Sequence, residues 1–168
     1  MFFVIATSLI GMAIPASTTI CPEGVVDQLD GLYRWQVQHM DGNEDPVQAF
    51  ASQRQRFTPS LFELLLQAKT LTPMRDGRFL DFDVFSNTQV STFGAAVKGC
   101  RTQAEGSIAA EVDVTTGLRG RPSGTPRRLL YELKLNNQGS WRINNITYLD
   151  EETFQLRPFL EKLLQPST

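Results

Sequence analysis

Hydrophobic residues recur at steps of three and four in the chain segment after residue 20, the spacing of one face of a helix. From Val25 to Met40 this spacing predicts a helix that begins near Pro22 and ends before Asp41-Gly42-Asn43. A short helix is expected over Pro46 to Arg56, and a third over Leu61 to Ala68. The first part of the domain is therefore expected to be helical.

Further along, hydrophobic and polar residues alternate, which is typical of half-buried strands. The predicted strands are Gly77 to Gln89, Thr92 to Lys98, Ser107 to Thr115, Arg128 to Leu135 and Ser140 to Tyr148. Asn136 to Gly139 has the composition of a hairpin turn, so the last two strands should pair antiparallel. Leu118 to Arg127, rich in Gly, Pro and Arg, predicts a long exposed loop. Glu151 to Leu164 predicts a closing helix that Pro158 either kinks or begins.

Helices grouped before strands are typical of the α+β class, in which helices cover one face of an antiparallel sheet. We therefore expect N-terminal helices packed on a curved antiparallel sheet, with a C-terminal helix. A curved sheet leaves a concave cavity, and concave cavities are where small ligands usually bind.

The first sixteen residues, Met1 to Ala16, carry no charge, and the apolar run from Phe2 to Ile14 has the length of a signal-peptide core. The run is short for a membrane-spanning helix. We expect cleavage after Ala16, which leaves one domain, 17–168, in the periplasm or outside the cell with no stable membrane span. Because no Lys or Arg precedes the run, the alternative is a buried N-terminal strand or helix.

The cysteines, Cys21 and Cys100, agree with export, since an even number in an oxidising compartment favours one disulfide. Two unpaired buried thiols are the alternative. Lipid attachment at Cys21 is less well supported, because Thr18-Thr19-Ile20 does not place a small residue directly before it.

Charge and motifs exclude several classes of function. A net charge of −2 gives no electrostatic footprint for nucleic acid, so we expect no nucleic-acid partner. The chain has no phosphate loop, dinucleotide fingerprint or His/Cys zinc cluster, so we expect neither a cofactor nor a bound metal. One basic group surrounds the Gly/Pro-rich loop and could hold an anionic partner or simply be solvated. Its members are Lys98, Arg101, Arg119, Arg121, Arg127 and Arg128.

Two stretches, Leu80 to Gln89 and Trp141 to Tyr148, resemble an uncharacterised family of bacterial exported proteins, often lipoproteins. That family has the cone-shaped α+β roll of nuclear transport factor two-like proteins. The resemblance covers roughly Val26 to Leu164. It implies helices inside a bent sheet with a pocket at the open end, and it implies no activity or membrane anchor. The candidate ligand-binding residues all lie in these two stretches: Asp81, Asp83, Gln89 and Trp141.

Asp81 and Asp83 would point to the same face of a strand, and paired carboxylates suit a general acid or a hard-cation site. The alternative is a structural, solvent-facing or turn-capping use. His39 is the only histidine. Several enzymes on this roll pair His with Asp, but a histidine at a helix C-terminus is also favourable by itself.

We expect a non-catalytic exported domain that binds a small ligand or an envelope protein partner, with a homodimer left open. One alternative is an enzyme that uses Asp81, Asp83 and His39. A hydrogen bond from His39 to either carboxylate inside a cavity would favour it. The other is an inhibitor or immunity-type protein, which would present a broad exposed surface.

Overall fold

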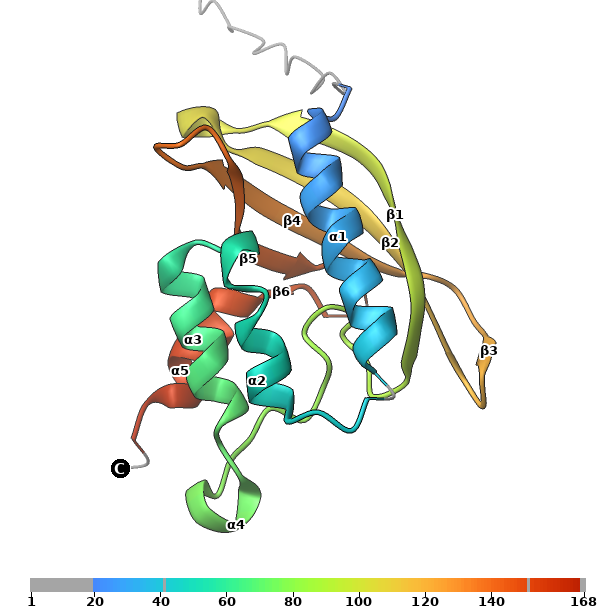
Figure 1. Ribbon diagram of the computed structural model, residues 1–168, viewed down its shortest axis with the longest axis vertical. Helices are drawn as coiled ribbons and strands as arrows, with labels where there is room; N and C mark the ends of the chain where they lie inside the picture. The colour runs from blue at the N-terminus through green and yellow to red at the C-terminus, as the bar shows by residue number, and fades with distance from the viewer. Residues whose placement is uncertain (1–19, 41, 151, 167–168) are drawn as a thin grey trace, which may run out of the picture.

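The computed structural model describes residues 20–40, 42–150 and 152–166 (Figure 1). The predicted signal segment, Met1 to Ala16, and its cleavage site lie outside these residues. No helix in the described part of the chain is both long and apolar enough to cross a membrane. The architecture is α+β, as predicted, with helices before and after an antiparallel sheet.

Four helices precede the sheet: α1 (Glu23–His39), α2 (Pro46–Ala51), α3 (Pro59–Lys69) and α4 (Pro73–Asp76). Helices α1 and α3 lie close to the bounds that the hydrophobic spacing predicts, and α4 was not predicted. The predicted helix over 46–56 is wrong in one respect, because it divides into α2 and a separate 3₁₀ turn at Arg54–Arg56. Each of the last three helices has a proline in its first turn, where a missing N–H breaks no helical hydrogen bond.

The sheet has the strand order β1-β2-β4-β5-β6, with β3 paired to β2, and all neighbours run antiparallel. Its strands are β1 (Ser91–Thr102), β2 (Ile108–Leu118), β3 (Arg121–Pro122), β4 (Arg127–Leu135), β5 (Trp141–Tyr148) and β6 (Phe154–Gln155). The predicted hairpin between the last two long strands is confirmed. Two bulges interrupt β1, and bulges bend strands; the strong curvature of a cone stays a prediction.

Helices cover one face of the sheet, and the hydrophobic core lies between the helices and that face (Figure 1). Helix α1 packs against β1 and β5, while α3 packs against β5 and the C-terminal helix α5 (Leu156–Leu164). Alternate residues of β2 and β4 point into the core, as their pattern predicts. Pro158 lies in the first turn of α5.

The segment predicted as a strand over Gly77 to Gln89 is not one. It forms turns, with only an isolated bridge between Asp83 and Thr88. The buried Tyr33 hydroxyl donates to the Phe85 carbonyl at 2.8 Å, and the buried Tyr148 hydroxyl donates to the Val84 carbonyl at 2.9 Å. Tertiary hydrogen bonds to the core thus replace the ladder that the alternation predicted. The exposed 118–127 loop is also partly ordered, because β3 pairs back onto β2.

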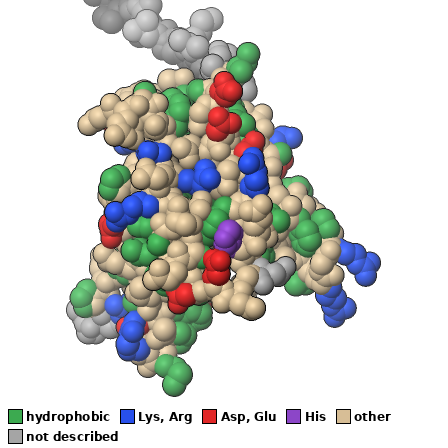
Figure 2. All heavy atoms as spheres, viewed as in Figure 1, with side chains coloured by type: hydrophobic (Ala, Val, Ile, Leu, Met, Phe, Trp, Pro, Cys, Tyr) green, Lys and Arg blue, Asp and Glu red, His purple; other side chains and the backbone are tan. Residues whose placement is uncertain are grey.

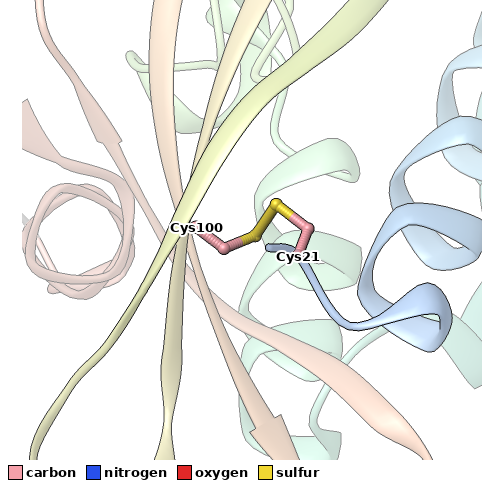
Figure 3. The surroundings of a disulfide bond; sticks show 2 residues. All are labelled: Cys21 and Cys100. Atoms are coloured by element: carbon pink, nitrogen blue, oxygen red, sulfur yellow. A yellow bond between two sulfur atoms is a disulfide. The ribbon is translucent and has the colours of Figure 1, made fainter. Parts of the chain in front are cut away.

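A disulfide joins Cys21, just before α1, to the buried Cys100 of β1, which confirms the predicted pair (Figure 3). The two Cα atoms are 5.0 Å apart, within the usual range for this bond. The link holds the start of α1 against the edge strand of the sheet.

Candidate functional site

A hollow of about 470 Å³ lies where α1 and α3 end beside the turn segment 79–91. Polar groups come from Gln36 of α1 and Lys69 of α3. The apolar part of the wall comes from Met40 and from the turn segment. The residues of that segment that line the hollow are Phe79, Leu80, Asp81, Phe82, Asp83, Thr88, Gln89, Val90 and Ser91.

Asp83 carries a half-buried carboxylate in the wall of this hollow, and the protein itself holds it in place. Its Oδ2 accepts hydrogen bonds from Gln36 Nε2 at 2.8 Å and from Ser86 Oγ at 2.9 Å. Its Oδ1 accepts from the backbone N–H of Phe85 at 3.0 Å. These bonds fix the position of the Asp83 carboxylate, so it cannot swing away from the wall of the hollow.

Behind Asp83 lie three buried tyrosines, Tyr33, Tyr131 and Tyr148. The hydroxyls of Tyr33 and Tyr131 are 2.7 Å apart. Because Tyr33 gives its single proton to the Phe85 carbonyl, Tyr131 must donate to Tyr33. Burial is the main cause that raises the pKa of all three phenols, and the negative charge of Asp83 raises each further. The phenols therefore remain neutral hydrogen-bonding groups that anchor the turn carrying Asp83.

Lys69, the last residue of α3, contributes the cation of the site. Its Nζ lies 5.1 Å from the centre of the Phe50 ring, a cation–π distance. Burial lowers the pKa of the Lys69 amine, and the carboxylate of Asp83 partly opposes this effect. Within the described part of the chain, no hydrogen bond or ion pair joins this amine to another group. It is thus a half-buried amine with free bonding capacity.

A second hollow, of about 240 Å³, adjoins the first and shares Gln36, Met40 and Lys69 with it. Its further lining includes Trp35, His39, Glu44 and Ala49. We call the two hollows together the Lys69 groove. The indole Nε1 of Trp35 is buried and has no hydrogen-bond partner among the described residues. The groove therefore combines apolar walls with a few polar atoms, the composition typical of small-molecule sites.

Three of the four predicted ligand-binding residues, Asp81, Asp83 and Gln89, line this groove together. Asp81 is exposed, and its backbone carbonyl accepts a hydrogen bond from Gln89 Nε2 at 2.8 Å. Trp141 lies apart from the groove, at the start of β5, where its ring occupies the space beside Gly24 that a Cβ there would need. The structure thus brings three of the four candidate residues to one groove and leaves Trp141 outside it.

His39 also lines the groove, but the structure does not bring it to either carboxylate. Its Nδ1 lies 2.9 Å from the Trp35 carbonyl, and its ring stacks on the Trp35 ring at 5.4 Å. Among the described residues, the acid within ion-pair distance is Glu44, with 3.8 Å between His39 Nε2 and the carboxylate. Because Asp83 is bonded to Gln36 instead, a His–Asp acid–base pair is not assembled.

No group of three or more His, Cys, Asp and Glu side chains is placed to hold a metal ion within the described residues. Asp81 and Asp83 do not form a carboxylate pair on a strand face, because the segment is a turn and Asp83 bonds inward.

The predicted basic group is divided between two places. Lys98, Arg101 and Arg128 line a hollow of about 250 Å³ on the sheet, together with Glu111 and Asp113. Arg119 and Arg121 are exposed near β3, where Lys and Arg side chains project at the edge of the molecule (Figure 2). Figure 2 shows cationic side chains dispersed over this face among other residues. The group is therefore not one uniform anion-binding patch.

Lys69 and the three tyrosines did not stand out in the sequence. A single charged residue at the end of the apolar run Leu61 to Ala68 was the available signal for Lys69. The tyrosines are far apart in the chain, and only the fold brings their hydroxyls to one turn. No protein-family model, curated protein or solved structure matches this chain.

Proposed function

We propose that this protein is an exported, non-catalytic domain that binds a small ligand in the Lys69 groove. The observation that carries the proposal is the amine of Lys69, which makes no hydrogen bond or ion pair with the described residues, in a groove whose other polar groups are mostly bonded within the protein. A ligand with a carboxylate or carbonyl oxygen would supply the acceptor that this amine lacks.

The groove also favours a ligand with an apolar body. Phe79, Leu80 and Val90 provide apolar wall, and Phe79 is 45% exposed and so available for contact. Asp83 opposes a second anionic group on the ligand, because its own charge is fixed in the wall. The favoured class is therefore a small molecule with one acceptor group and an apolar remainder.

Export to the periplasm or the exterior is supported by the disulfide, since such bonds persist in oxidising compartments. Intact mass spectrometry of protein from the envelope fraction of the native host tests this part. A mass that begins at Ser17 and lacks two hydrogens is expected. A full-length product with two free thiols would contradict export.

Binding is tested by following backbone amide signals of the ¹⁵N-labelled protein during titration with benzoate, which has one carboxylate and an apolar ring. We expect saturable shifts at residues 79–91 and at Gln36 and Met40. Lys69→Met should abolish them, whereas Lys98→Met, at an exposed lysine paired with Asp113, should not. Shifts that are absent, or that persist in the Lys69→Met protein, would contradict the proposal.

A further inference from the structure

The chain has four lysines, and Lys69 has surroundings unlike those of the other three. Lys98 and Lys134 are largely exposed, and each lies within ion-pair distance of an acid, 4.0 Å from Asp113 and 3.6 Å from Glu132. Lys162 is exposed on α5. Lys69 is half-buried without an ion pair, and it is the lysine that faces an aromatic ring and lines both hollows of the groove.

Those surroundings are what a nucleophilic amine requires. An ammonium cannot attack a carbonyl carbon, because its nitrogen has no free electron pair, so reactivity depends on the neutral form. Removal from water favours that form, and no carboxylate within ion-pair distance holds Lys69 in the charged state. Its attachment to the end of a packed helix fixes the amine beside the bound molecule.

We propose that Lys69 forms a reversible imine with an aldehyde or ketone bound in the groove. This inference rests on the proposed function and narrows its ligand class to carbonyl compounds with an apolar body. The Nζ electron pair forms a bond to the carbonyl carbon while the C=O π pair moves to oxygen, and a proton passes from nitrogen to that oxygen. The C–O bond then breaks with its electron pair as a proton from solvent water joins the oxygen, water leaves, and the nitrogen electron pair forms the N=C bond of a protonated imine.

Asp83 suits the product of this step. A protonated imine keeps a positive charge near the position of the Lys69 ammonium, on which the Asp83 carboxylate acts electrostatically. Because Gln36, Ser86 and the Phe85 amide hold that carboxylate, it stabilises the cation without rearrangement. Asp83 is thus a positioning residue rather than a reacting one.

The test treats the full chain with benzaldehyde and sodium cyanoborohydride at neutral pH. The hydride reduces any imine to a stable benzylamine, and peptide mapping by mass spectrometry locates the benzyl group. Four lysines that reacted alike would each take a quarter of the lysine label. We expect Lys69 to take more than about twice that share.

Two variants keep the result interpretable. Phe79→Ser removes an exposed apolar wall without touching the core, so the share of label on Lys69 should fall in a folded protein. Lys98→Arg removes only its own label, so the ratio of label on Lys69 to label on Lys134 and Lys162 should stay unchanged. Benzoate added as a competitor should also lower it, because both molecules require the same groove.

An even distribution of label over the lysines, or a share on Lys69 that neither Phe79→Ser nor benzoate lowers, would overturn the imine. The amide titration with benzoate separates this failure from failure of the binding site. If benzoate binds while label is even, the groove is a ligand site without covalent chemistry.

Discussion

Replacing Tyr33 by phenylalanine removes one oxygen from the core but disturbs two hydrogen bonds. The hydroxyl donates to the Phe85 carbonyl at 2.8 Å and accepts from Tyr131 at 2.7 Å. The variant leaves a buried Tyr131 donor and a buried carbonyl without partners, and each orphan costs roughly 1–3 kcal/mol. We expect Tyr33→Phe to lower the free energy of unfolding by about 3 kcal/mol.

Tyr131→Phe should cost much less. Tyr33 then keeps its bond to the Phe85 carbonyl, no buried donor is left without a partner, and the loss is about 1 kcal/mol. When Tyr131→Phe is added to Tyr33→Phe, it removes the Tyr131 hydroxyl that the first substitution had left without an acceptor. The double variant should therefore be no less stable than Tyr33→Phe alone, so the two effects are strongly non-additive.

Urea unfolding followed by circular dichroism, on the four proteins of this cycle, measures these differences. Thermal melts should show a fall of about 6–12 °C for Tyr33→Phe, at roughly 2–4 °C per kcal/mol for a domain of this size. Additive effects, or equal costs for the two single variants, would refute the direction of donation assigned here.

Two further predictions concern pH and the disulfide. Because burial raises the pKa of Tyr33, Tyr131 and Tyr148, the folded state retains protons that the unfolded state loses above about pH 10, so stability falls there by about 4 kcal/mol per pH unit for the three phenols. The effect of Lys69 on stability is opposite, because its pKa is lowered in the folded state and the unfolded state therefore binds more protons at pH values below that range. Stability should rise with pH there. Urea midpoints measured across alkaline pH should accordingly show a shallow rise followed by a steep fall. The double variant Cys21→Ser/Cys100→Ser should lower the free energy of unfolding by about 4 kcal/mol, because the disulfide no longer restricts the unfolded chain. Urea unfolding measures this loss, with reductant-treated protein as the comparison. An unchanged free energy of unfolding would contradict the idea that the disulfide stabilises the fold in this way.

The elements of this fold could be predicted where local spacing and tertiary packing agree. Val25, Leu29 and Leu32 fall on one face of α1, and that face is the buried one. In β2, the buried Ala110, Val112 and Val114 alternate in the same way with the half-buried acids Glu111 and Asp113. Periodicity is sufficient in such segments because one side of each element contacts the core and the other contacts water.

The segment 77–89 shows where that reasoning fails. The alternation of Leu80, Phe82 and Val84 with polar residues has the form of a strand, yet backbone carbonyls of this segment accept hydrogen bonds from tyrosines of α1 and β5. No spacing within the segment encodes a hydroxyl that is 52 residues away in the chain. Gly31, in the middle of α1, is another residue whose role local spacing does not reveal. The guanidinium of Arg56 lies against the helix at this point, where it donates to the Gln28 carbonyl and occupies the space that a side chain at residue 31 would need.

Asp83 connects the structural and functional readings of the molecule. Its bonds to Gln36, Ser86 and the Phe85 amide make it a turn-capping residue, one of the uses expected from the sequence. The same bonds fix a negative charge in the groove wall, where it acts on Lys69 and on the three phenols. A residue can therefore order a loop and set the electrostatics of a site with one set of contacts. Asp83→Asn removes the charge and replaces one acceptor oxygen by an N–H donor, so it can keep the bond from the Phe85 amide through Oδ1 but loses acceptance from Gln36 and Ser86 at the other position, whereas Asp83→Ala removes all three bonds.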